Sequence, residues 1–157
     1  MAPAARAALA LVLASLAFPA SAATDHSDGA LLGAVQRFTA DGAAYLSFDL
    51  HPADCDTAPR AAVRFEVTGG GRTRSVGGHD QCQSTEARLV GSGRGWMLET
   101  FADDYAYEFY DYSTRRGTRG YSYRFRVGGR VVERGSFRVV SGLRGSRVTG
   151  LRRVRAR

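Results

Sequence analysis

Lysine is absent from this chain of 157 residues, and all 22 of its basic residues are arginine. Familiar catalytic motifs are absent too: there is no phosphate-binding loop, no His-Glu-x-x-His and no Gly-x-Gly-x-x-Gly that opens a helix. Gly91-Ser92-Gly93 lacks the spacing of a Gly-x-Ser-x-Gly elbow and lies between two expected strands, whereas that elbow joins a strand to a helix. The absence of these motifs weighs against an enzyme, and the sequence predicts no cofactor.

Long hydrophobic runs are scarce in this sequence. The one strong example covers residues 7–18. Arg6 precedes it and small residues follow it as far as Ala23, which is the pattern of a secretory signal peptide. The run is too short for a helix that crosses about 30 Å of bilayer. We expect residues 1–23 to be a cleaved signal peptide, cut after Ala22 or Ala23. We expect no transmembrane segment and a secreted or periplasmic location.

Cysteine is limited to Cys55 and Cys82. In an exported protein an even pair predicts one disulfide, worth about 3 kcal/mol in the chain-entropy model. His51 and His79 lie near the two cysteines in the sequence, so a structural zinc site is the alternative. The oxidising destination favours the disulfide.

Glycine is plentiful, with 19 residues, and it separates segments in which apolar and polar residues alternate. The alternation is clearest in residues 121–127 and predicts strands with one buried side. Residues 31–38 fit a helix as well as a strand. For residues 24–140 we predict an all-β domain, an antiparallel β-sandwich, with a small barrel as the alternative.

The Tyr-x-Tyr-x-Phe-x-Val run of residues 121–127, followed by the glycine turn Gly128-Gly129, resembles the final hairpin of immunoglobulin-like and fibronectin-like sandwiches. The resemblance covers one hairpin and implies architecture, not function. The antibody order of Cys, Trp and Cys is not met, since Trp96 follows both cysteines.

Charge is divided unevenly along the chain. Residues 24–114 carry 7 arginines and 14 acids, whereas residues 115–157 carry 14 arginines and the single acid Glu133. Sandwich folds bring distant segments together, so the two halves either neutralise each other or leave a basic face for an anionic partner. Residues 141–157 are expected to form an arginine-rich edge strand or tail.

The loop of residues 113–120 combines guanidinium groups, glycines and hydroxyls, which suit phosphate, sulfate or carboxylate. Two more arginines follow on the polar side of the next expected strand. The predicted ligand-binding residues are Arg115, Arg116, Arg119, Arg124 and Arg126. We therefore expect an exported, non-enzymatic binding or assembly module for an anionic polymer, an envelope surface or a protein partner. A structural envelope component, its arginines paired with acids, is an alternative.

Residues 101–112 combine acids with aromatic rings. Two carboxylates and stacking tyrosines suit a glycan, so a carbohydrate-binding or carbohydrate-active site is a further alternative. The residues for a glycan or calcium site are Asp103, Asp104, Glu108 and Tyr110. The competing interpretation places one aromatic row in the core and pairs the acids with arginine across strands.

His26 supplies one more metal hypothesis. Cleavage after Ala23 leaves Thr24-Asp25-His26 at the new amino terminus, where an amine, two backbone nitrogens and an imidazole resemble a square-planar copper or nickel site. Cleavage after Ala22 moves the imidazole to the fourth position and removes that chelate.

Overall fold

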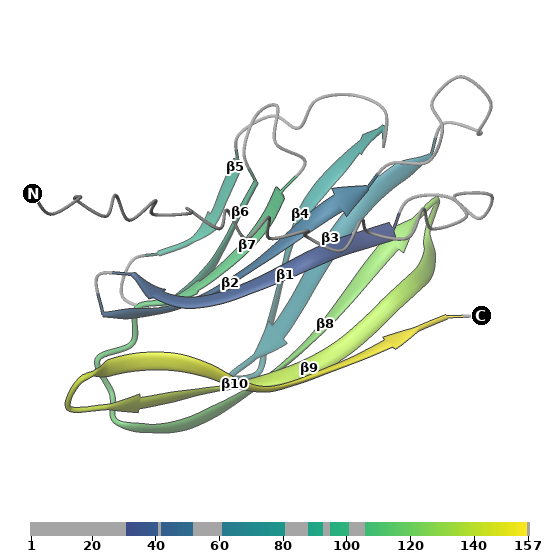
Figure 1. Ribbon diagram of the computed structural model, residues 1–157. Coiled ribbons are helices and arrows are strands. Elements are labelled where there is room, and N and C mark those ends of the chain that lie inside the picture. The colour runs from purple at the N-terminus through teal and green to yellow at the C-terminus, as the bar shows by residue number, and fades with distance from the viewer. Residues whose placement is uncertain are drawn as a thin grey trace, which may run out of the picture.

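The computed structural model describes residues 31–40, 42–51, 61–80, 88–92, 95–100 and 106–156. These residues form ten strands in two antiparallel sheets that pack face to face, and the prediction of an antiparallel β-sandwich is confirmed (Figure 1). No helix that could cross a membrane is found in this part of the chain.

Each sheet has five strands. The first sheet has the order β1-β2-β7-β6-β5 and the second the order β10-β9-β8-β3-β4. The bounds in the first sheet are β1 Leu31–Ala40, β2 Ala43–His51, β7 Ala106–Asp111, β6 Trp96–Thr100 and β5 Arg88–Gly91. Those in the second are β10 Gly145–Arg155, β9 Arg130–Gly142, β8 Gly117–Val127, β3 Ala62–Gly69 and β4 Arg72–Asp80.

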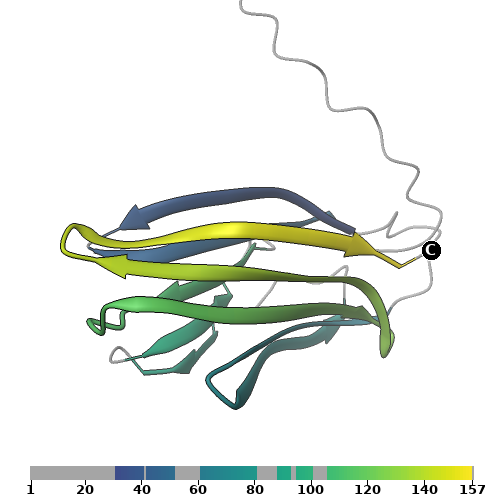
Figure 2. The same ribbon diagram turned by 90° about the horizontal axis from the view of Figure 1, so that it is seen from below.

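The chain crosses between the sheets three times, after β2, after β4 and after β7. It then ends in a continuous meander of the three longest strands of the second sheet, β8, β9 and β10, which lie side by side in Figure 2. The backbone N–H of Ser146 at the start of β10 donates to the carbonyl of Gly42, 3.1 Å away, in the β1–β2 turn. This bond ties the two sheets together along one margin of the sandwich.

The core lies between the sheets and is mostly aromatic. Alternate residues of each strand point inward because successive side chains of a strand project to opposite sides. The inward tyrosines of β8, Tyr121 and Tyr123, are buried, as the alternation predicts. The largest fully buried side chains are Tyr107, Tyr123, Phe48, Phe65, Phe109, Phe125, Phe137, Leu46, Leu98 and Val63.

A one-residue bulge in β10 decides which of its arginines face solvent. Thr149 pairs with Arg138, but the next pair of the ladder is Arg152 with Ser136, so β10 advances three residues while β9 advances two. Gly150 has a φ of 60°, a left-handed conformation that glycine adopts without steric cost. Both Thr149 and Arg152 therefore face solvent, and Arg153 turns inward.

Candidate functional site

The solvent-facing side of the second sheet gathers arginines from four strands. Residues that pair across β10, β9, β8 and β3 point to the same side, so the outward arginines of these strands share one surface. Among the described side chains of this surface the one acid is Glu66. We call this surface the basic face; its seven arginines are Arg64, Arg124, Arg126, Arg134, Arg138, Arg147 and Arg152.

Several of these arginines are direct neighbours. Arg64 lies opposite Arg126 across β3 and β8, and Arg124 lies opposite Arg134 across β8 and β9. Like charges in directly opposed positions destabilise a sheet. Within the described residues the basic face has one ion pair, from Arg126 Nε to Glu66 Oε2 at 3.2 Å. The face therefore carries excess positive charge that a bound anion would offset.

Hydroxyl side chains cross the basic face in a row perpendicular to the strands. Thr73, Thr68, Ser122 and Ser136 are successive partners on β4, β3, β8 and β9, and Arg152 of β10 ends the row. The hydroxyls of Thr68 and Thr73 share a hydrogen bond of 2.8 Å. Neighbouring strands lie about 4.8 Å apart, so the row offers a hydrogen-bonding group at that interval.

The five arginines predicted from the sequence separate into three environments. Arg124 and Arg126 belong to the basic face, while Arg115 and Arg116 are exposed in the loop of residues 112–116. Arg119 has the same parity on β8 as Tyr121, so its side chain turns inward and is 24% exposed. Its guanidinium is engaged within the protein, and we leave it out of the basic face.

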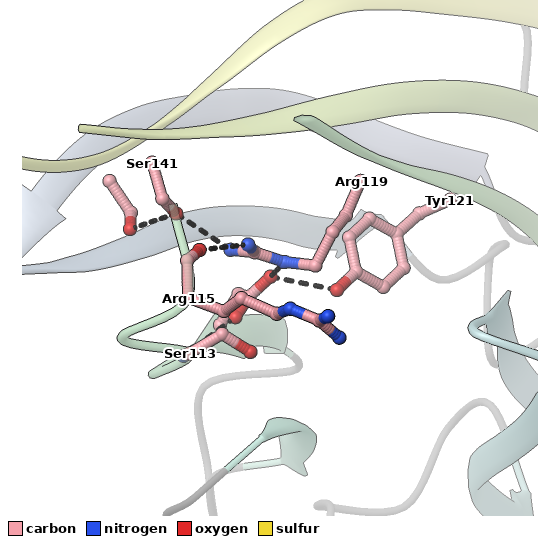
Figure 3. A network of polar contacts seen from close by, with 7 residues as sticks. Ser113, Arg115, Arg119, Tyr121 and Ser141 are labelled. Carbon is pink, nitrogen blue, oxygen red and sulfur yellow. Dashed lines mark hydrogen bonds and ion pairs between the residues drawn. The ribbon is translucent and has the colours of Figure 1, made fainter. Parts of the chain in front are cut away.

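Arg119 neutralises Asp111, a fully buried carboxylate at the end of β7. Figure 3 shows Arg119, Tyr121 and Ser113, which surround this carboxylate. Arg119 Nε and the Tyr121 hydroxyl donate to Asp111 Oδ2 at 2.9 and 2.7 Å, and the Ser113 backbone N–H donates to Oδ1 at 2.8 Å. Burial alone raises the pKa of Asp111, but these hydrogen bonds outweigh burial and hold the pKa below its usual range.

The remaining nitrogens of Arg119 fasten the loop that precedes β8. Nη1 donates to the backbone carbonyl of Arg115 at 2.8 Å, and Nη2 donates to Ser141 Oγ on β9 at 2.7 Å. Ser141 in turn shares a hydrogen bond of 2.5 Å with Ser146 on β10. One guanidinium thus joins β7, the loop of residues 112–116, β8 and β9.

Glu133 forms a second buried cluster of the same composition. Arg153 of β10 binds it with two hydrogen bonds of 2.9 Å, Nε to Oε1 and Nη2 to Oε2, and the Tyr123 hydroxyl donates to Oε1 at 2.7 Å. Arg155 Nε lies 3.6 Å from Oε2. Asp111 and Glu133 are therefore each paired with an arginine and a tyrosine, which is the condition for burying a charge at acceptable cost.

The acids and aromatic residues of β7 alternate between the two sides of the first sheet. Asp111 faces the core, whereas Glu108 and Tyr110 lie on the outer side of the first sheet. The hydroxyls of Tyr45 and Tyr110 donate to the two carboxylate oxygens of Glu108, which is 8% exposed. Burial raises the pKa of Glu108, and the hydrogen bond from Tyr110 offsets part of that rise. Both oxygens of this predicted glycan residue thus have partners within the protein.

The pKa of Asp111 is lowered on folding and that of Glu108 is raised, so the two acids should affect stability with opposite pH dependence. Asp111→Asn should cost about 2 kcal/mol at neutral pH, because it removes a charge-assisted hydrogen bond to Arg119. The pKa of Asp111 is lowered on folding, so its contribution is present above its unfolded value of 3.8 and is lost as pH falls through the folded value. Urea unfolding from pH 7 to pH 2 should therefore show the gap between wild type and Asp111→Asn closing in acid.

Glu108→Gln is the matched comparison. The pKa of Glu108 is raised on folding, so stability is favoured by the protonated form and falls as pH rises through the folded value. Glu108→Gln should lose less stability than Asp111→Asn at pH 7 and gain relative to wild type as pH rises from 4 to 7. Equal losses for the two variants at every pH would contradict these assignments.

Other predicted site residues lie outside the described residues: Asp103, Asp104, Cys55, Cys82 and His26. The side chains of His51 and His79 are also outside what the structure describes, so the disulfide, zinc, calcium and copper hypotheses stay predictions. Across the described ranges no three His, Cys, Asp or Glu side chains gather closely enough to hold a metal ion.

Five arginines of the basic face were missed by sequence reasoning, although part of the signal was present. Arg134, Ser136 and Arg138 are exposed and alternate on β9 with the half-buried Gly135 and the buried Phe137 and Val139, which marks an outward polar row. The missed residues are Arg64, Arg134, Arg138, Arg147 and Arg152.

No family model matches the chain, and neither does any curated protein or solved structure.

Proposed function

We propose that this protein is an exported, non-enzymatic binding module whose basic face holds an anionic macromolecule or surface. The observation that carries the proposal is the cluster of seven arginines from four strands against one acid. Six of the seven are exposed, and Arg126 is the exception. Arginine is suited to this task because its planar guanidinium binds phosphate, sulfate or carboxylate with two hydrogen bonds.

The cost of the charge arrangement also supports binding. Two pairs of arginines lie directly opposite one another on adjacent strands, a placement that lowers stability in the free protein. Asp111 of β7 in the first sheet and Glu133 of β9 in the second sheet bind other arginines on the inner side. Among the described residues, Glu66 is therefore the one acid that offsets charge on the basic face.

Two further features belong to the proposal. The signal-peptide pattern of residues 1–23 supports export, and export in turn supports the Cys55–Cys82 disulfide. The strand orders β1-β2-β7-β6 and β9-β8-β3-β4 correspond to the orders A-B-E-D and G-F-C-C′ of immunoglobulin-like sandwiches, with β5 and β10 as additional edge strands. This correspondence supports an immunoglobulin-like architecture for the domain.

Titration with a sulfated polysaccharide such as heparin tests the proposed function. Calorimetry at several salt concentrations should give a logarithm of the association constant that falls linearly with the logarithm of salt concentration, because binding releases counterions. A slope of about −4 or steeper is expected if most of the seven arginines take part. An association that is absent at 50 mM salt, or insensitive to salt, would contradict the proposal.

A further inference from the structure

An open groove of about 580 Å³ lies on the basic face beside the β3–β4 turn. Its volume is within the range of roughly 300–1,000 Å³ typical of sites for small ligands. Outward side chains of the hydroxyl row form part of its lining, and two guanidinium groups lie beside them. The lining residues used here are Thr68, Gly120, Ser122, Ser136, Arg138 and Arg152.

The groove exists because side chains are missing where strands would otherwise carry them. Gly120 lies outward on β8 opposite Arg138, and a Cβ placed there would meet no atom within 4 Å. Gly150 also lines the groove, and its bulge turns Arg152 outward while Arg153 binds Glu133 on the inner side. The depression and the placement of its second guanidinium thus depend on two glycines.

The lining chemistry favours a ligand that combines an anionic group with hydroxyls. Arg138 and Arg152 provide guanidinium groups from adjacent strands, and Ser122 and Ser136 lie between them and the hydroxyl of Thr68. Tyr121 and Phe137 also line the groove, but they are only 5% and 1% exposed, so they offer little open ring surface for stacking. Proteins that bind single-stranded nucleic acid rely on such aromatic surfaces.

We infer that the groove binds a short segment of an anionic polysaccharide, with Arg138 and Arg152 on its oxyanion and the hydroxyl row on its sugar hydroxyls. This inference rests on the proposed function and adds the class of ligand and its location. The oxyanion is a sulfate, a phosphate or a carboxylate, all of which accept two hydrogen bonds from one guanidinium. The rest of the basic face contributes electrostatic attraction. This attraction weakens as salt is added and does not depend on the shape of the ligand.

Gly120→Val tests the groove without changing charge. The φ of Gly120 lies outside the left-handed region, and valine is favourable in strands, so the variant should fold at least as well as wild type. The matched control is Thr118→Val, two residues earlier on the same outer side of β8 and outside the groove lining. Affinity is measured by calorimetry for a heparin-derived tetrasaccharide and for long-chain heparin.

Gly120→Val should weaken binding of the tetrasaccharide roughly tenfold or more, which corresponds to about 1.4 kcal/mol, while Thr118→Val leaves it within twofold. Long-chain heparin should bind both variants with the salt dependence of wild type. A tetrasaccharide that binds wild type and Gly120→Val equally would overturn the groove and leave the proposed function intact, whereas failure of long-chain heparin to bind wild type would overturn the function itself.

A desulfated tetrasaccharide that retains its carboxylates identifies the oxyanion. If it still binds, and binding still depends on Gly120, the arginines bind a carboxylate. If binding is lost, they bind the sulfate. Single-stranded DNA of matched charge tests whether the groove binds a nucleic acid instead of a polysaccharide. Binding of that DNA more tightly than the tetrasaccharide, with the same dependence on Gly120, would overturn the assignment to a polysaccharide.

Discussion

Arg119→Ala is expected to destabilise the protein by about 3 kcal/mol, because removing one partner of a buried ion pair leaves the other charge uncompensated. Asp111 is fully buried and accepts the Nε hydrogen bond of Arg119 at 2.9 Å. The same substitution also frees Ser141 and the carbonyl of Arg115 from their hydrogen bonds to the guanidinium. Equilibrium unfolding in urea at pH 7 measures the loss.

Arg116→Ala is the matched control, since it removes an exposed arginine three positions earlier in the chain. Its effect should stay within about 0.5 kcal/mol, as for other surface substitutions. Arg119→Ala combined with Asp111→Ala should cost less than the sum of the single changes, because the two side chains share one interaction. If Arg119→Ala and Arg116→Ala prove equally mild, the structural role assigned to Arg119 is wrong.

Removal of arginines from the basic face is expected to have the largest effect on binding. The variant Arg124→Gln/Arg134→Gln/Arg138→Gln should bind heparin about 10²-fold more weakly at about 0.1 M salt. This estimate takes about 1 kcal/mol for each arginine near an anionic surface and 1.4 kcal/mol for each tenfold change. The slope of the salt dependence should become shallower by about 3. Stability should stay equal or rise, because Arg124 and Arg134 oppose each other on neighbouring strands.

A second triple variant separates the basic face from general basicity. Arg88, Arg115 and Arg116 are exposed and lie outside the face, so replacing all three with Gln changes the net charge equally. Heparin should bind this variant within about threefold of wild type, because distant exposed charges are screened beyond about 10 Å at 0.1 M salt. Equal losses for the two triple variants would show that overall charge, and not the basic face, determines binding.

The inward and outward sides of β8 could be predicted from the sequence, and that pattern also contained the position of Arg119. Tyr121 and Tyr123 were expected in the core, and they are buried there. Arg119 has the same parity, so extending the alternation by two residues places it inside with them. Its predicted role as a surface ligand came from the composition of the loop and ignored this parity.

Other parts of the site depend on information that alternation does not contain. The bulge at Gly150 changes the parity of β10, and without it Arg152 and Arg153 would exchange sides. A similar one-residue shift in β9 sends Val131 outward and Glu133 inward. Bulges follow from backbone conformation and cross-strand register, which local sequence patterns specify weakly.

The basic face as a whole is a product of topology. Arg64 on β3 lies opposite Arg126 on β8. Between these two strands the chain passes through β5, β6 and β7 of the other sheet and then returns. The sequence showed an arginine-rich second half, but it could not show that β3 would add an arginine to it. The competing interpretation paired acids with arginine across strands, but the sequence did not identify Arg119 as the partner of Asp111 or Arg153 as the partner of Glu133.

Mapping of backbone amide shifts by NMR during titration with a heparin-derived oligosaccharide tests the central claim most directly. The account predicts that the perturbed amides cluster on β8, β9 and β10 around Ser122, Ser136, Arg138 and Arg152. Amides of β2 and β7 in the first sheet should stay unchanged, because the other sheet separates them from the ligand. Perturbations confined to the loop of residues 112–116 or to the first sheet, or no perturbation at saturating ligand, would contradict the assignment of the basic face as the binding surface.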